Sequence, residues 1–120
     1  LTLRLAGLIG PGRHPGRFGR SGSLAGADLA VNLVHVADIA AFIQLLLAQP
    51  QPVSDCVNLC CPQHPTKQQF YPQAAAHAGL AAVSFSVADE PSRTVNSDRS
   101  QTYAGFSYRF ASPLQALDFC

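Results

Sequence analysis

Charged residues are scarce in this chain of 120 residues. Asp, Glu, Lys and Arg make up 12% of it, about half of the roughly 25% that soluble domains usually carry. The formal net charge is +1, so no strong field attracts nucleic acid or a membrane surface, and we expect neither as a partner. A surface this poor in charge is expected where a face packs against another subunit or a missing part of the polypeptide, although a low charge content shared by the whole family would also explain it. Self-association through an exposed apolar face is therefore expected.

Long apolar runs and targeting signals are also lacking. Purely apolar runs such as residues 45–48 are far shorter than the ~18 residues of a membrane span. The sequence begins at Leu1 without a methionine or a recognisable signal peptide, which indicates a piece cut from a longer chain. The cysteine spacing is not that of a small secreted scaffold, so we expect reduced thiols and a cytoplasmic location. The cysteines are Cys56, Cys60, Cys61 and Cys120.

The sequence contains alternating strand and helix patterns, and its length fits a single domain or fragment over residues 1–120. Residues 1–9 predict a strand that ends in a Gly-Pro-Gly turn. Residues 12–26 have the glycine content of a loop, with room for a short helix at 17–24. Residues 31–36 alternate like a second strand.

A helix and a third strand are predicted next. Asp38 is placed to cap a helix over residues 39–49, because its carboxylate can accept the free backbone N–H groups of the first turn. Residues 55–61 form a short apolar strand that Pro62 closes. This strand, helix, strand order predicts an α/β fold.

The second half of the chain carries further helix signals. Thr66 and Gln69 have the spacing of a capping box, which predicts a helix to Gly79 with Pro72 inside it. Residues 82–87 alternate like a half-buried strand. The remaining predictions are a short helix that Ser97 or Asn96 caps and that ends at Gly105, and a final helical turn that begins at Pro113.

A basic, glycine-rich stretch follows the first strand. A dinucleotide-binding fingerprint needs a third glycine where Pro15 stands, and an apolar helix after it, so we interpret the glycines as a turn. The guanidinium groups of Arg13, Arg17 and Arg20, with His14 nearby, have paired donors that suit phosphate oxygens. A solvated loop explains the same residues equally well.

Other candidate chemistry is weaker. Cys56, Cys60, Cys61 and His64 lack the paired spacing of a structural zinc site, and buried thiols are the favoured interpretation. His35 and His77 are more often packed or solvated than metal ligands in such positions. The sequence contains no G-x-S-x-G nucleophile elbow.

Four stretches together resemble the C-terminal part of the extended short-chain dehydrogenases and reductases, the NAD-dependent epimerases and dehydratases of nucleoside-diphosphate sugars. LRLAGLIGPGR is similar to their strand that ends in a Tyr-Gly-Pro-Gly turn, with Ile9 in place of tyrosine. NLVHVADIAAFI is similar to their V-H-V-x-D strand-to-helix element, and CVNLCCPQHPTKQQFY to a strand followed by a capped helix. RTVNSDRSQTYAGFSYRF is similar to a late segment, with Arg93 for lysine and Asn96 for aspartate.

The resemblance implies the last strands of a doubly wound nucleotide-binding sheet together with a small α/β substrate-binding lobe. It implies that the cofactor fingerprint and the catalytic residues lie in an absent N-terminal half, so this chain would hold no cofactor and have no catalytic activity alone. The full-length parent would use NAD or NADP and a small molecule, such as a sugar nucleotide, as substrate. The substrate-binding residues would be Arg13, His14, Arg17, Asn32 and His35. The alternative is a non-catalytic module that binds a small ligand or another protein.

Overall fold

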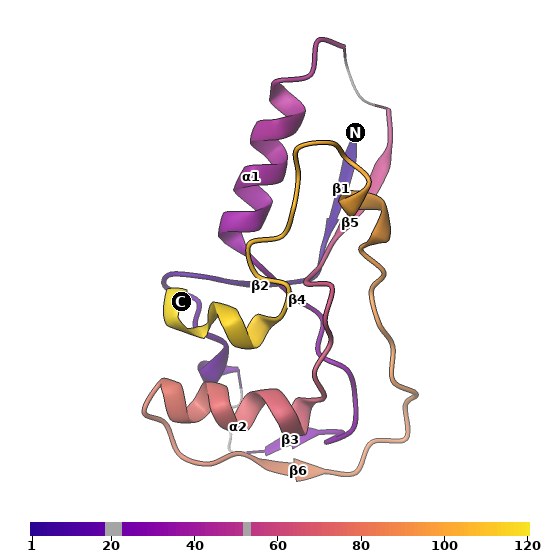
Figure 1. The fold of residues 1–120 in the computed structure, drawn as a ribbon. Helices are drawn as coiled ribbons and strands as arrows, with labels where there is room; N and C mark the ends of the chain where they lie inside the picture. The colour runs from indigo at the N-terminus through magenta and orange to yellow at the C-terminus, as the bar shows by residue number, and fades with distance from the viewer. Residues whose placement is uncertain (19–22, 52–53) are drawn as a thin grey trace.

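Helices and short parallel strands alternate along the chain, as an α/β fold requires. The computed structural model describes residues 1–18, 23–51 and 54–120. Each strand that the sequence predicts is shorter in the structure, because the pattern extends beyond the paired residues. In chain order the elements are β1 (Thr2–Leu5), β2 (Gly7–Ile9), η1 (Pro15–Arg17), β3 (Ser23–Ala25), β4 (Leu33–His35), α1 (Val36–Leu47), β5 (Cys56–Leu59), α2 (Lys67–His77), β6 (Ser84–Ser86), α3 (Asp98–Gln101) and η2 (Pro113–Phe119) (Figure 1).

The first predicted strand changes its partner half-way along. β1 runs parallel to β5, and β2 runs parallel to β4. The amide of Ala6 donates to the carbonyl of Leu59 (3.0 Å), whereas the amide of Gly7 donates to that of Asn32 (3.1 Å). The chain therefore leaves one parallel partner and joins the other between these two residues, which divides the predicted strand into β1 and β2.

The β2 and β4 pair separates two hydrophobic cores. Leu33 lies in one core and its neighbour Val34 in the other, because successive side chains of a strand point to opposite faces. We call the first the Phe70 core and the second the Phe42 core. The Phe70 core contains Ile9, Val31, Leu33, Phe70, Ala74, Phe110, Ala116 and Leu117, and the Phe42 core contains Val34, Ile39, Phe42, Val57 and Leu59.

Helix α1 begins three residues earlier than predicted, and its cap is different. The N-cap is His35, whose Nδ1 accepts the amide proton of Ala37 (3.0 Å), so the prediction of Asp38 as the cap is wrong. Asp38 lies in the first turn, 2% exposed, and its carboxylate accepts the amides of Arg109 (2.8 Å) and Phe110 (3.3 Å). A distant backbone segment thus uses the acceptor that the sequence pattern assigns to the helix end.

Helix α2 confirms the capping box. The hydroxyl of Thr66 accepts the amide of Gln69 (3.2 Å), and the side chain of Gln69 accepts the amide of Thr66 (2.9 Å). Pro72 lies inside the helix as predicted. The helix ends at His77, before the predicted Gly79, whose φ of +69° belongs to the left-handed region that favours glycine after a helix.

The glycine-rich stretch contains a strand that its composition conceals. Strand β3 runs parallel to β6 and includes Ser23 and Leu24, so the short helix considered at 17–24 does not reach these two residues. Arg17 is the last residue of the short helix η1. Residues 19–22 of that stretch, Arg20 among them, lie outside the described residues. Strand β6 ends before Val87, whose side chain is 93% exposed.

The last predicted elements are present in shorter form. Ser97 is the N-cap residue of α3, although its side chain makes no capping bond, and Asn96 Oδ1 instead accepts the amide of Asp98 (2.7 Å). The helix ends at Gln101 rather than Gly105. Segment η2 begins at Pro113 as predicted, behind a second capping box.

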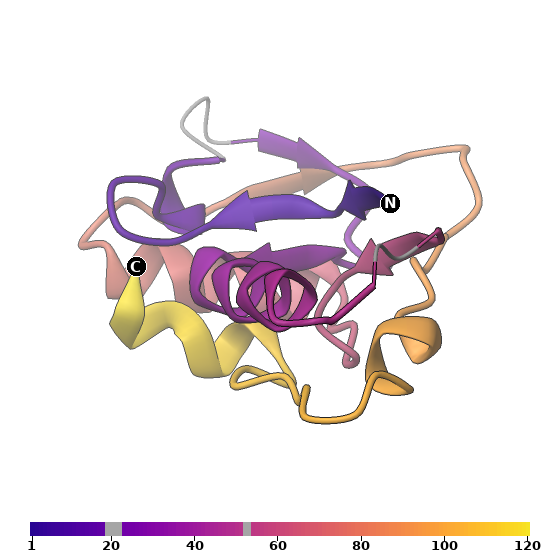
Figure 2. The ribbon, with the colours of Figure 1, turned by 90° about the horizontal axis from the view of Figure 1, so that it is seen from above.

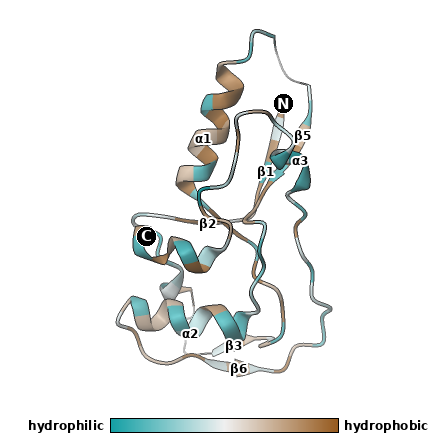
Figure 3. Cartoon of the chain, viewed as in Figure 1, coloured by the Kyte–Doolittle hydropathy of each residue, from teal (hydrophilic) through white to brown (hydrophobic). Residues whose placement is uncertain are grey.

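Large apolar side chains of α1 and β1 are exposed. Helix α1 is hydrophobic for most of its length (Figure 3), and its exposed side chains include Val36, Ile43 and Leu47, the last 82% exposed. Figure 2 shows α1, α2 and η2 on the same side of the β1 and β2 strand, and Leu5 is 50% exposed. None of the helices in the described ranges combines the length and the apolar character that crossing a bilayer requires.

Candidate functional site

The residues that follow β2 form a tight turn. Gly10 and Arg13 exchange backbone hydrogen bonds (2.9 and 3.3 Å), and Gly12 between them has a φ of +78°, which an L side chain rarely adopts. The guanidinium Nε of Arg13 donates back to the carbonyl of Leu8 (2.8 Å), and its carbon lies 5.3 Å from the ring centre of Phe18. The turn thus fixes the start of the segment that we call the 10–17 loop.

The far end of the 10–17 loop packs directly on α2. A Cβ at Gly16 would collide with the backbone carbonyl of Ala74, so this contact requires glycine. His14 is the N-cap residue of η1, because its Nδ1 accepts the amide of Gly16 (2.9 Å). The loop is therefore held by backbone contact with α2 as well as by its own turn.

A line of three side chains joins the loop to the C-terminal segment. His14 Nε2 lies 2.9 Å from His77 Nδ1, at the end of α2, and His77 Nε2 lies 2.9 Å from a carboxylate oxygen of Asp118, in η2. The two rings stack with centres 5.1 Å apart. Burial lowers the pKa of His14 below its usual value, and the nearby His77 and Arg17 lower it further.

A hollow of about 420 Å³ opens beside these side chains. Arg17 is exposed at its rim, and burial raises the pKa of the Cys120 thiol. The lining residues are Gly12, His14, Arg17, Ala78 and Cys120. The structure therefore brings two of the five predicted site residues, His14 and Arg17, into one hollow, with Arg13 in the same loop.

The other two predicted site residues have their polar atoms bonded within the protein. His35 is 4% exposed; its Nδ1 accepts the Ala37 amide, so its Nε2 carries the proton and donates to the carbonyl of Phe119 (2.9 Å). Asn32 donates to the carbonyl of Arg93 (2.9 Å) and accepts the amide of Val95 (2.7 Å). Neither residue lines the hollow.

The cysteine-rich strand has no metal-site geometry. Cys60 and Cys61 are fully buried, and burial raises the pKa of their thiols to about 11 and about 12. Cys56 is exposed, and His64 uses Nδ1 to donate to the carbonyl of Val31 (3.1 Å). In the parts of the chain that the structure describes, no three His, Cys, Asp or Glu side chains gather as metal ligands would.

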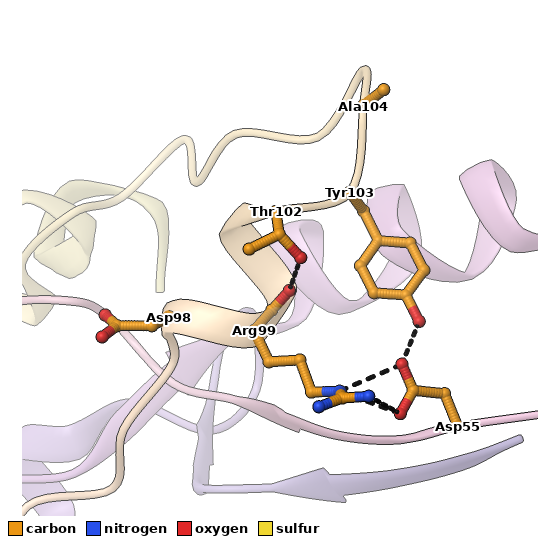
Figure 4. A pocket seen from close by; sticks show the side chains of 6 residues that line it. All are labelled: Asp55, Asp98, Arg99, Thr102, Tyr103 and Ala104. Carbon is orange, nitrogen blue, oxygen red and sulfur yellow. Dashed lines mark hydrogen bonds and ion pairs between the residues drawn. The ribbon is translucent and has the colours of Figure 1, made fainter.

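A second hollow lies at the other end of the molecule (Figure 4). Arg99 and Tyr103 both bind the carboxylate of Asp55, at 2.7 Å from Arg99 Nη2 and 2.6 Å from the Tyr103 hydroxyl. These hydrogen bonds, that from Arg99 first, lower the pKa of Asp55 to about 2. These bonds occupy the Asp55 carboxylate and tie α3 to the start of β5.

Sequence reasoning did not identify the distant members of the first hollow. His77 and Cys120 lie more than sixty residues from His14 along the chain, and no motif connects them. The predicted capped helix contains His77 near its end, but nothing in the sequence indicates which segment this side chain contacts. Their convergence depends on how η1 and η2 pack against α2.

Comparison with known proteins identifies the fold. No family model matches the chain. It is 40% identical over 114 residues to protein YeeZ of Escherichia coli K12, a match that covers 93% of this chain and 41% of YeeZ. The chain thus spans about two-fifths of the length of the curated relatives that it matches.

Solved structures extend this finding. A functionally unknown conserved protein from Silicibacter pomeroyi is 26% identical, with a TM-score of 0.74 over 97% of this chain and 47% of its own. UDP-N-acetylglucosamine 4-epimerase of Bacillus cereus is 19% identical, with a TM-score of 0.70 over 97% of this chain and 42% of its own. MoeE5, solved with UDP-glucuronic acid and NAD, is 18% identical, with a TM-score of 0.72 over 98% of this chain and 44% of its own. The chain has the fold of a part of each of these three proteins.

Proposed function

We propose that this chain is the substrate-binding C-terminal part of an NAD(P)-dependent epimerase, dehydratase or reductase that acts on a sugar nucleotide or a related carbonyl compound. The observation that carries the proposal is the alignment of nearly the whole chain with less than half of each similar structure. Two of these structures are of MoeE5, with UDP-glucuronic acid and with UDP-glucose, each together with NAD. In such a protein the redox chemistry would take place in the N-terminal half.

The open edge of the sheet supports a missing partner half. In the described part of the chain β1 pairs with β5 alone, and parallel sheets of two strands are not stable without cover on both faces. The outer side of β5 is occupied, because α3 is tied to it through Asp55 and Arg99. We therefore place the nucleotide-binding half at the free edge of β1 and on the exposed apolar face of α1.

The exposed face of α1 predicts self-association when the chain is alone. Changing Leu47 to Ser removes an apolar side chain that is 82% exposed, so it should shift an isolated dimer or larger species toward monomer in analytical ultracentrifugation. The exposed Leu80, 41% exposed near the end of α2, is the matched control. If Leu47→Ser and Leu80→Ser change the monomer fraction equally, the exposed face of α1 is not the contact face.

The 10–17 loop is proposed to contact the anionic part of the substrate. Arg17 has an exposed guanidinium at the hollow, and Arg13 and His14 hold the turn that presents it. Guanidinium groups bind phosphate oxygens through paired, charge-assisted hydrogen bonds. Asn32 and His35 act through position, since Asn32 fixes the backbone near Val95 and His35 fixes the start of α1.

A titration of the ¹⁵N-labelled chain tests this proposal. UDP-glucose and UDP should shift the amide signals of the 10–17 loop at millimolar concentration, and glucose should not. Changing Arg17 to Gln should weaken the effect about tenfold, the loss of roughly 1.4 kcal/mol that one charge-assisted bond represents. Arg4→Gln, on exposed β1, is the matched control and should leave binding unchanged.

Two results would contradict the proposal. The first is an absence of loop shifts with every phosphate compound, or shifts confined to another part of the chain. The second is tight binding of NAD(H) or NADP(H) to this chain alone, since we expect no affinity in the micromolar range. The coding sequence upstream should also encode a strand followed by Gly-x-x-Gly-x-x-Gly, and a Tyr-x-x-x-Lys pair.

A further inference from the structure

The hydrogen-bonded line that runs from the Gly16 amide through His14 and His77 to Asp118 allows only one arrangement of protons. A backbone amide can only donate, so His14 Nδ1 must be the acceptor of the Gly16 amide and the ring proton must sit on Nε2. His14 Nε2 then donates to His77 Nδ1, which leaves the second ring proton on His77 Nε2 to donate to Asp118. Both rings are therefore neutral, and every nitrogen in them is already used.

An added proton has no free position in this arrangement. Protonation of His14 Nδ1 displaces the Gly16 amide directly. Protonation of His77 Nδ1 sets two N–H groups against each other at 2.9 Å, and His14 relieves this only by carrying its proton on Nδ1, which again displaces Gly16. Proton uptake with the rings in contact therefore removes the side-chain cap of η1.

Charged and titratable groups face the two rings from the loop, from α2 and from η2. From the loop, Arg17 opposes a positive charge on His14. From α2 there is His77 itself, and from η2 there is the Asp118 carboxylate, which accepts from His77 Nε2. The nearby Cys120 thiol is neutral, because burial raises its pKa. Because the pKa of His14 lies below its usual 6.5, the unfolded chain binds more protons just below that pH, and stability falls as pH drops through this value.

We propose that His14, His77 and Asp118 form a proton-operated clasp that holds the 10–17 loop against α2 and η2 at neutral pH and releases η1 when one proton enters. The clasp joins three elements that are remote in sequence, and η1 has no other side-chain cap. It would make the presentation of Arg17 at the hollow depend on pH. The clasp itself does not depend on which ligand the loop binds.

Nuclear magnetic resonance on the full 120-residue chain between pH 8 and pH 5 tests the clasp. The protection factor of the Gly16 amide against hydrogen exchange should fall about tenfold, with the same midpoint as the ring nitrogens of His14 and His77. The Gly7 amide, which donates to the carbonyl of Asn32, is the internal reference and should keep its protection. A Gly16 amide that stays protected while His14 becomes doubly protonated would overturn the proposal.

A conservative substitution separates the clasp from a merely structural contact. In Asp118→Asn the amide oxygen can still accept from His77, but the negative charge beside the two rings is lost, so the pH midpoint at which the Gly16 amide loses its protection should fall. The control is Asp89→Asn, which changes an exposed carboxylate on another loop. If both variants titrate like the wild type, the Asp118 part of the proposal is wrong. These signals do not require a ligand, so they remain informative if UDP-glucose fails to bind.

Discussion

The two hydrophobic cores differ in how completely the chain itself encloses them. The Phe70 core is surrounded by β2 and β4, α2 and η2, and the 10–17 loop is fixed to its outer side by the contact of Gly16 with Ala74. The Phe42 core is covered on one side by the rings of Tyr103 and Phe106, which meet Phe42 edge-on at 5.2 and 4.9 Å. Its other elements, α1 and β1, present apolar side chains to solvent.

This difference indicates which part of the molecule is self-sufficient. A helix that is hydrophobic on most sides is normally buried, and α1 is not buried by the described residues. The region around Phe70 is therefore enclosed by the described residues, whereas the region around Phe42 leaves apolar side chains of α1 and β1 exposed. The proposed nucleotide-binding half would complete the second region and leave the first largely unchanged.

The largest expected effect comes from removing either central ring. Phe70→Ala and Phe42→Ala each delete a fully buried side chain, which should lower the free energy of unfolding by about 3–5 kcal/mol. Urea denaturation followed by circular dichroism measures this loss. If the comparison is right, hydrogen exchange in the wild type should already be faster around Phe42 than around Phe70.

Milder variants keep this test interpretable if the alanine variants do not fold. Phe70→Leu and Phe42→Leu should cost roughly 1–2 kcal/mol each. Equal exchange protection for α2, which supplies Phe70 and Ala74 to the Phe70 core, and for β5, which lies in the Phe42 core, would show that the two regions are equally stable, against the comparison.

A smaller effect is expected from the carboxylate that joins the two regions. Asp38 is buried in α1 and accepts the amides of Arg109 and Phe110, which precede η2. Asp38→Ala leaves these donors without a partner. The amide of Phe110 is buried whereas Arg109 is exposed, so one buried orphan group should cost about 1–3 kcal/mol. Asp38→Asn, which keeps one acceptor oxygen, should lose less in the same urea experiment. If Asp38→Ala leaves the free energy of unfolding unchanged, the 109–110 segment finds other partners for its amides.

The smallest effect concerns acid stability at the edge of the Phe42 region. Bonding to Arg99 lowers the pKa of Asp55 from 3.8 to about 2, so the folded chain favours the ionised form. The stabilisation is present above pH 3.8 and is lost as pH falls toward 2. The urea midpoint of Asp55→Asn should therefore fall less steeply than that of the wild type between pH 4 and pH 2.

The control for this pH series is Asp89→Asn, which alters an exposed carboxylate outside the cluster. It should follow the wild-type curve through the same range. An identical acid slope in wild type and Asp55→Asn would show that the ion pair contributes no measurable stability, as is common for exposed pairs.

Signals confined to a few neighbouring residues were predicted well. The capping box of Thr66 and Gln69 is confirmed because both partners lie within one helical turn. Pro113 begins η2 for the same reason. The assignment of Asp38 as a cap is wrong because the sequence could not show that His35 takes this position and that the 109–110 backbone uses the carboxylate.

The candidate site was predictable only in its local part. Arg13, His14 and Arg17 are neighbours in one loop, so any fold keeps them close. His77 and Asp118 contact the loop through two other elements, and nothing in their own sequence surroundings indicates this contact. The parallel strand β3 was missed because β6, its partner, lies about sixty residues away.

The sequence by itself determined the alternation of strands and helices, the helix boundaries marked by local capping, and a basic turn after the first strand. Backbone hydrogen bonding and steric limits act over a few residues, so these features are encoded locally. Tertiary structure alone decided which strands pair, that β2 and β4 separate two cores, and that two histidines and an aspartate meet in one line. Such contacts depend on the packing of whole elements, which short-range patterns do not specify.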